Sequence, residues 1–206
     1  MARPRLHSLD ELLDIAEQLV TSGDPAGLTL RSLATGSGAS NGTIYHAFRS
    51  KEDLLARLWL RASERLGAIL EEAVGSAHGE EAVVAASVAP VTFARRHQAS
   101  AQLFFAQRSD QLFSADLPAE LGDTLAREQR RFRRLLADLA VGIWDRKDRP
   151  AVEAVATCVV DVPGGILRRA LIDGRRPDPA TERRIEAAVR AILAVPLDPP
   201  RTRSPR

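Results

Sequence analysis

The residues best suited to chemistry lie between Thr29 and Lys51, and they suit hydrogen bonding and charge pairing with a polyanion. Hydroxyl, amide and imidazole groups can bond to phosphate oxygens or base edges, and a lysine ammonium can pair with a phosphate. The segment from Pro25 to Lys51 contains no Asp or Glu. Three basic residues in such a window also arise by chance, so charge alone leaves the partner open. The candidate contact residues are Thr29, Arg31, Ser40, Asn41, Gly42, Thr43, Tyr45, His46 and Lys51, with Arg49 as a further cation.

Two short helices should position these side chains. Thr29 suits the N-cap of the first helix, which ends in the stretch Gly36-Ser37-Gly38, and Ser40 suits the N-cap of the second. Residues 40–43 are small or polar, so the start of the second helix is slim enough for a major groove about 12 Å wide. This pattern is typical of a helix-turn-helix, although two short helices can also pack together for stability alone.

Helices on either side should hold this pair in place. Ser8 and Glu11 have the spacing of a capping box, and the helix that they begin should stop at Gly23-Asp24-Pro25. Ser50 suits the N-cap of a long helix that runs to about Gly75. The residues expected to form a small core between the two short helices are Leu33, Ala34, Ala39, Ile44 and Phe48.

The run GASNGTIYHAFRSKEDLL, residues 38–55, resembles the tetracycline-repressor (TetR) family. The family signature joins a Gly-x-Ser turn, a Gly-Thr-hydrophobic-Tyr recognition helix, an aromatic residue and a Ser-Lys-Glu-x-Leu helix start. The resemblance covers roughly residues 8 to 60, and beyond them only length and helicity agree. It implies Thr43, Tyr45 and Lys51 at phosphates, with Asn41, Gly42 and His46 nearest base edges or backbone.

Two features bear on how the DNA would be read. Position 41 is Asn where the family often has a cation, and position 47 is Ala where it often has an aromatic residue, so fewer phosphate contacts are expected. The N-terminal arm Arg3-Pro4-Arg5 could reach into a minor groove, but a loose solubilising terminus is the simpler reading.

The remainder of the chain is helical in pattern. We expect helices at about 80–97, 99–108, 118–144, 149–173 and 178–195, with a kink or break near residue 162 because Pro163 removes a helical hydrogen bond. The predicted fold is all-α, with about nine helices. Its parts are a helix-turn-helix domain over residues 1–54, a helical effector-binding and dimerisation domain over 55–196, and a disordered tail over 197–206.

The last two helices carry apolar stripes that suit a two-fold, four-helix dimer interface. Alternatively, the same stripes could close the subunit's own core. The resemblance favours a homodimer, because helix-turn-helix dimers read half-sites about one helical turn apart on a palindromic operator. The stripe residues are Val152, Val155, Ala156, Val159, Val160, Ile166 and Leu167 in one helix, and Ile185, Ala188, Val189, Ile192 and Leu193 in the other.

A small-molecule effector would bind among the central helices, in a pocket lined by large or unusual side chains. Most such residues in helices simply pack in the core, and His97 lies beside Arg95 and Arg96, which suggests an exposed helix end. A cluster of five arginines between residues 127 and 134 is expected to be a solvated face. The candidate ligand-binding residues are Phe93, His97, Phe104, Phe105, Phe113, Trp144 and Cys158.

The motifs that mark other functions are missing from this sequence. The four histidines show no HExxH spacing, the one cysteine has no CxxC partner, and no phosphate-binding glycine loop or nucleophile elbow occurs, so we expect no catalytic residue, metal or cofactor. No run approaches the roughly 20 apolar residues of a membrane helix, and a single cysteine suits the cytoplasm. The sequence predicts a dimeric regulator, a repressor released by its effector. A helical adaptor and a small enzyme are the alternatives.

Overall fold

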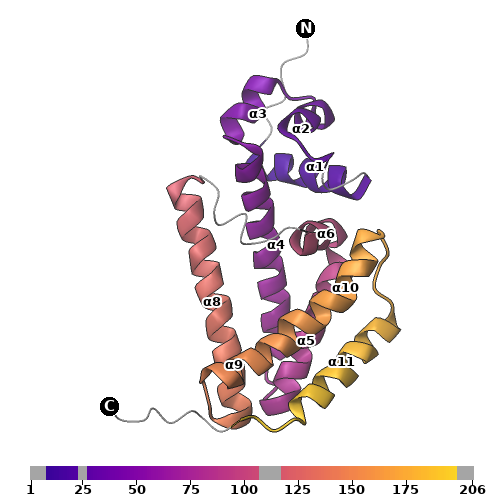
Figure 1. The fold of residues 1–206 in the computed structure, drawn as a ribbon. Helices are drawn as coiled ribbons and strands as arrows, with labels where there is room; N and C mark the ends of the chain where they lie inside the picture. Colours follow the sequence, from indigo (N-terminus) through magenta and orange to yellow (C-terminus); the bar gives the residue numbers. More distant parts are fainter. Residues whose placement is uncertain (1–7, 23–26, 107–116, 199–206) are drawn as a thin grey trace.

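A computed structural model describes residues 8–22, 27–106 and 117–198, and throughout these ranges the ordered elements are helices (Figure 1). The all-α prediction is confirmed. The N-terminal elements are α1 (Leu9–Ser22), α2 (Leu30–Ser37), α3 (Asn41–Ala47), α4 (Lys51–Val74), α5 (Gly79–Arg96) and α6 (Gln98–Ala106). The later elements are α8 (Ala119–Trp144), α9 (Arg149–Ala156), the π-helical turn η2 (Thr157–Asp161), α10 (Val162–Ile172) and α11 (Pro179–Leu193).

Side-chain caps begin the first four helices at the positions that the sequence indicates. The Glu11 carboxylate accepts a bond from the Ser8 N–H at 2.8 Å, while the Ser8 hydroxyl accepts from the Glu11 N–H at 3.2 Å. The hydroxyls of Thr29, Ser40 and Ser50 cap α2, α3 and α4 in the same way. Each cap satisfies a backbone donor that the helix itself leaves free.

The N-terminal helices α1, α2 and α3 share one small core with the first turns of α4. Leu33, Ile44 and Phe48 are completely buried in it, Ala34 is buried, and Ala39 is half-buried. Gly38 ends α2 in the left-handed conformation, with φ of 68°, which lets the chain turn sharply into α3. We call α1, α2 and α3 the head.

Helix α4 is the link between the head and the rest of the molecule, which we call the body (Figure 1). Its first turns pack in the head core, and its later turns pack in a second, larger core with α5, α8, α9, η2, α10 and α11. In the body, α11 packs on α5 and α10, and α6 lies against α1, α4, α5 and α10.

The chain from Arg149 to Ile172 is helical throughout but widens into a π turn at Thr157–Asp161. The Val162 N–H donates to the Thr157 carbonyl, five residues earlier. Pro163 has no N–H to offer the Val159 carbonyl, so the regular α pattern cannot continue through this point. The irregularity expected near residue 162 is therefore a π turn.

The sequence analysis expected no segment apolar enough to form a membrane helix, and this same segment shows that expectation to be wrong. Arg149–Ile172 is long and apolar enough to cross a membrane, by length and composition alone, and it is the one such helix in the part of the chain described. Ala151, Val155 and Leu167 are fully buried in the body core. The core helix of a folded protein meets the same criterion, and 33% of the most apolar window of this segment is buried within the subunit.

The two apolar stripes of the C-terminal helices divide between the core and the surface. Val155, Val159 and Leu167 from one helix, and Ile185 and Val189 from α11, are buried within the subunit. These five residues belong to the subunit core, which was the alternative to a dimer interface, and a partner cannot reach them. Helical periodicity marks a buried face without saying what covers it.

Some predictions concern residues outside the described ranges. The arm Arg3-Pro4-Arg5, the stop signal Gly23-Asp24-Pro25, Phe113 and residues 199–206 belong to this group. Leu197 and Asp198, the first two residues of the predicted tail, lie within the described range: Leu197 packs against the body core, and the Asp198 carbonyl accepts a bond from Arg146 at 2.9 Å.

The buried carboxylate at the start of α4 generates a stability prediction. Asp53 is 2% exposed and accepts bonds from the Arg49 N–H at 3.0 Å and from Arg57 Nε at 2.7 Å. Asp53→Ala leaves a part-buried donor unpaired, so the free energy of unfolding in urea should fall by about 2 kcal/mol. Glu52→Ala, an exposed neighbour in the same turn, should change it by less than about 0.5 kcal/mol. Equal losses in the two variants would contradict this account.

Candidate DNA-reading face and central cavity

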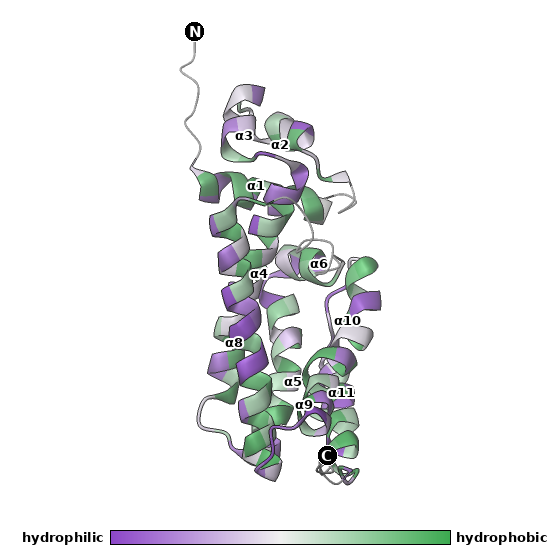
Figure 2. Ribbon diagram, turned by 60° about the vertical axis from the view of Figure 1, so that its left-hand side comes forward, coloured by the Kyte–Doolittle hydropathy of each residue, from purple (hydrophilic) through white to green (hydrophobic). Residues whose placement is uncertain are grey.

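The outer face of α3 carries the side chains that the sequence singled out. Asn41, Gly42 and His46 are exposed and Tyr45 is 61% exposed, whereas Ile44, in the same helix, is completely buried. The burial of Ile44 fixes the rotation of α3, because turning the helix would expose this residue. With Ile44 facing the core, the opposite side of α3, which carries the exposed residues, faces outward at the tip of the head (Figure 2).

Two of the predicted contact residues, Thr29 and Ser40, already serve as helix caps. The Ser40 hydroxyl accepts from the Thr43 N–H at 3.1 Å and lies 2.9 Å from the Thr43 hydroxyl. The Thr29 hydroxyl accepts from the Ser32 N–H at 3.0 Å. A hydroxyl oxygen can accept a second hydrogen bond, but in this structure these hydroxyls cap the N-termini of α2 and α3.

The basic residues predicted to contact DNA lie near the starts of α2 and α4. Arg31 and Arg49 are exposed, and Lys51 is half-buried at the first position of α4. Glu52 lies next to Lys51, and bonds from its own backbone N–H and from the Ser50 hydroxyl lower the pKa of Glu52. Asp53 is buried and paired, so its charge is turned away from solvent.

An ion-pair network joins the head to α4 and α6. The Glu17 carboxylate accepts bonds from Arg65 Nη1 at 2.8 and 2.9 Å and from the Ser100 hydroxyl at 2.9 Å. Arg65 also donates to Ser100, and Arg61 pairs with Asp14. Residues from α1, α4 and α6 thus meet at one place. The sequence analysis missed this network, because its partners are far apart in the chain and show no common spacing.

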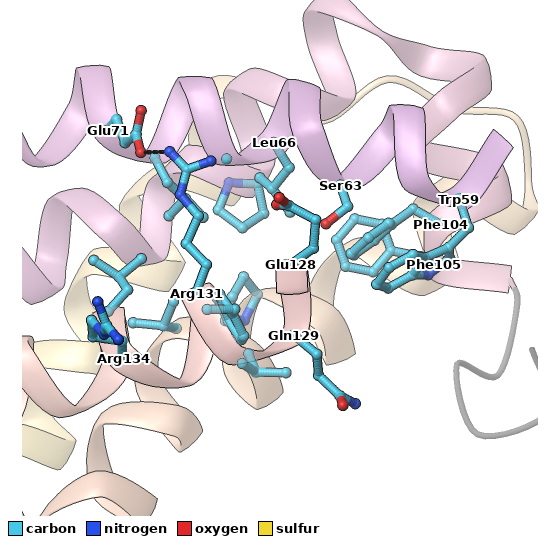
Figure 3. A pocket seen from close by; sticks show the side chains of 18 of the residues that line it. Trp59, Ser63, Leu66, Glu71, Phe104, Phe105, Glu128, Gln129, Arg131 and Arg134 are labelled. Atoms are coloured by element: carbon cyan, nitrogen blue, oxygen red, sulfur yellow. Dashed lines mark hydrogen bonds and ion pairs between the residues drawn. The ribbon is translucent and has the colours of Figure 1, made fainter. Parts of the chain in front are cut away.

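A cavity of about 460 Å³ lies in the body, between α4 and α8 and closed by α5, α6, η2 and α10 (Figure 3). This volume falls within the range of small-molecule sites. Most of the lining is apolar, with a few charged groups. The lining residues are Trp59, Ser63, Leu66, Gly67, Leu70, Glu71, Pro90, Phe104, Phe105, Glu128, Gln129, Arg131, Phe132, Arg134, Leu135, Asp138, Val159, Val160 and Pro163.

Aromatic rings gather at one end of the cavity. Trp59 and Phe104 are stacked, with ring centroids 5.2 Å apart and planes 16° apart, and Phe105 meets Phe104 edge-on at 5.5 Å. Phe104 and Phe105 were predicted ligand-binding residues, and both line this cavity. Trp59 also lines the cavity and was not among the predicted ligand-binding residues.

The other predicted ligand-binding residues of the described ranges do not line this cavity. Phe93 and Cys158 are completely buried core residues, and burial raises the pKa of the Cys158 thiol to about 11. Trp144 is half-buried at the end of α8. His97 caps the end of α5 with its ring near Phe93, and burial, with a smaller effect of Arg65, lowers the pKa of His97.

Helix α8 supplies the polar lining residues that the sequence analysis did not select. Arg131 and Arg134 belong to the arginine cluster, and both are exposed as expected, although they stand at the rim of the cavity. Arg131 forms an ion pair with Glu71 of α4 across it. Glu128 comes from the same face one turn earlier. No group of three or more His, Cys, Asp or Glu side chains able to hold a metal ion occurs in residues 8–22, 27–106 or 117–198.

The head matches a known sequence family. The model for the family described as "Bacterial regulatory proteins, tetR family" matches residues 12–58. An uncharacterised HTH-type transcriptional regulator of Mycobacterium tuberculosis (strain CDC 1551 / Oshkosh) is 40% identical over 58 residues, which are 28% of this chain and 29% of the relative. The chain therefore spans less than a third of the length of this relative in the match.

Solved structures share the fold of the whole chain. A bacterial regulatory protein in the tetR family from Rhodococcus RHA1 superposes with a TM-score of 0.65 at 16% identity, covering 90% of this chain and 94% of that one. The fatty acid degradation regulator FadR from Bacillus halodurans superposes with a TM-score of 0.64 at 15% identity, with the same coverage. At these identities the likeness shows the fold alone.

Gly42, on the outer face of α3, offers a substitution that should affect protein stability and DNA binding in opposite directions. A Cβ at Gly42 would meet only the Ser40 hydroxyl oxygen, at 3.7 Å, which is an ordinary contact. Gly42→Ala should therefore raise the free energy of unfolding, by up to about 1 kcal/mol from helix propensity. It should also weaken DNA binding about tenfold, because the added methyl group keeps the backbone of α3 from a close approach.

Gly122→Ala is the matched control for this substitution. Nothing lies within 4 Å of a Cβ at Gly122, and this residue is in α8, away from the head. It should stabilise the protein to a similar degree and leave DNA binding unchanged, as measured by fluorescence anisotropy. Unimpaired DNA binding by the Gly42 variant would show that α3 does not approach DNA closely at this point.

Proposed function

Because the chain belongs to the tetR family of bacterial regulatory proteins, we propose that it is a dimeric repressor, released from a palindromic operator by a small molecule. This family consists of DNA-binding transcriptional regulators and not of enzymes. A cytoplasmic location follows from an operator on the chromosome. The domain division at residues 54 and 196 and the contact residues predicted from the sequence are part of this proposal.

The exposed polar face of α3 is the observation that carries the proposal. Asn41, Tyr45 and His46 point away from the head core in a segment without acidic residues. Tyr45 is a large aromatic side chain left 61% exposed, which a fold without a partner at this face would not require. Its ring and hydroxyl suit contact with the sugar-phosphate backbone.

A dimer through α10 and α11 would place two such faces on one duplex. The two helices lie together at the edge of the body, and the C-terminal end of α10 is apolar at the surface (Figures 1 and 2). Ile172 is 67% exposed there, and Val160 is 42% exposed. Ile172, which lies beyond the predicted stripe, is apolar surface that a partner could cover, whereas Val160, a member of the stripe, also lines the cavity.

The release step would pass through α6. Phe104 and Phe105 line the cavity, while Leu103, between them and Ser100, is buried in the head core. A ligand that moves these rings also moves the residues that hold α1. In a dimer, the ligand would favour one spacing of the two heads over another. Changing the populations of these two states from 1:99 to 99:1 requires that the ligand bind the favoured state about 5.5 kcal/mol more tightly.

The DNA-contact prediction distinguishes phosphate contacts from base contacts. Tyr45→Ala and Lys51→Ala should each weaken binding about equally to a palindrome from the gene's own upstream DNA and to a scrambled duplex. Lys51→Ala should also reduce the salt dependence of binding, because it removes a cation, whereas Tyr45→Ala should leave it unchanged. Asn41→Ala and His46→Ala should instead change which half-site is preferred. Anisotropy titrations over a range of salt concentrations measure both effects. A sequence-selective loss for Tyr45 or Lys51 would refute the phosphate assignment.

The oligomeric state provides a separate test. Sedimentation equilibrium without DNA should give twice the chain mass of 22.4 kDa. A lone chain at all concentrations, with no DNA retention, would favour the helical adaptor instead.

A further inference from the structure

We infer that the central cavity binds an apolar molecule with one positive charge, which pairs with Glu128. The inference rests on the proposed function in one respect, since the occupant would be the effector. It names the chemical class of that effector from the cavity itself. Four observations support it: the apolar walls, the lack of an ion pair at Glu128, the distribution of the other charges and the aromatic rings at one end of the cavity.

The walls of the cavity exclude a strongly hydrated ligand. Leu66 and Leu70 from α4, Pro90 from α5, and Phe132 and Leu135 from α8 surround the space with hydrocarbon. A sugar or a nucleotide would lose its water here and gain few hydrogen bonds. An aliphatic or aromatic body of small-molecule size fits the volume and the surface of this cavity.

Glu128 is the half-buried carboxylate of the cavity lining that has no ion pair in the described parts of the chain, whereas Arg134 and Asp138, which also have none there, are exposed. Its side chain extends from α8 toward Ser63 and Leu66 of α4 (Figure 3). It is half-buried, and within the described parts of the chain it forms no hydrogen bond or ion pair with another side chain. A carboxylate in apolar surroundings is costly unless a positive group pairs with it. A cationic ligand would supply that group.

The other charges at the cavity do not favour an anion. Arg131 is already paired with Glu71 across the opening, and Arg134 is exposed at the rim with Asp138 one turn further along α8. The lining thus contains three carboxylates, Glu71, Glu128 and Asp138, against two guanidinium groups. An anionic ligand could pair with Arg134 only at the exposed rim, would have to break the Arg131 pair to gain a second cation, and would meet the carboxylate of Glu128.

The aromatic end of the cavity adds a second attraction for a cation. Trp59, Phe104 and Phe105 cluster on the same side of the cavity as Ser63, close to where Glu128 reaches across (Figure 3). The face of an aromatic ring is electron-rich and attracts a cation within about 6 Å. Ring faces and a carboxylate together select for an organic cation over a neutral molecule of the same shape.

The test compares two probes of nearly identical size and shape but opposite charge, tetraphenylphosphonium and tetraphenylborate. Isothermal titration calorimetry on the DNA-free protein should show binding of the phosphonium and much weaker binding of the borate. Two smaller or flatter cations, benzyltrimethylammonium and rhodamine 6G, extend the range of sizes. Trp144→Phe leaves Trp59 as the one tryptophan, so quenching of its fluorescence would report binding in this cavity.

Glu128→Gln keeps the shape of the side chain and removes its charge. It should weaken phosphonium binding about tenfold, because it removes the Coulombic attraction between the carboxylate and the cation, and should reduce the ratio of phosphonium to borate affinity. Glu120→Gln is the control, an identical change on an exposed residue of α8 outside the cavity lining, and it should leave binding unchanged. Thermal unfolding shows whether both variants fold.

The outcomes separate this inference from the proposed function. Preference for the borate, equal binding of both probes, no binding of any of the three cations, or equal effects of the two variants would overturn the inference, even if the protein binds its operator. Cation binding that depends on Glu128 supports the inference, whether or not the protein binds DNA. Specific DNA binding that the cation weakens would support both.

Discussion

The junction of α1, α4 and α6 is the interaction on which the rest of the structure depends. Glu17 holds Arg65 and Ser100 together, and Leu103 extends the head core into α6. Without this junction the head would be joined to the body only by the first turns of α4, and the direction of α3 would not be tied to the body. Partly buried, charge-assisted bonds with several partners define a single geometry better than an exposed ion pair does.

The local structure of the head could be predicted because its determinants are close in sequence. Ser8 with Glu11, Ser40 with Thr43, and Gly38 at the end of α2 each act over four residues or fewer. Such caps and turns are set by the chemistry of neighbouring side chains. The same holds for the π turn before Pro163, where the prediction gave the position of an irregularity but not its form.

The cavity and the junction could not be predicted in the same way, because they depend on which helices pack together. Phe93 and Phe104 have the same side chain and lie in neighbouring helices, yet one is core and the other lines the cavity. Glu17 and Ser100 are 83 residues apart. An apolar stripe is equally consistent with a subunit core and with a dimer interface, so the sequence left both open for Val155 and Ile185, which are core residues.

Under the proposed function, helix α6 would connect the cavity to the outer face of α3, because it contacts both the cavity and the head core. It is only nine residues long, from Gln98 to Ala106, so little more than one turn separates Ser100 at the junction from Phe104 and Phe105 at the cavity. A short helix packed on both sides moves as a unit, because close-packed side chains do not absorb a shift of its axis. Any ligand that separates Phe104 from Trp59 therefore displaces Leu103 within the head core. The free energy for that displacement can come only from contacts that the ligand makes better in the shifted state.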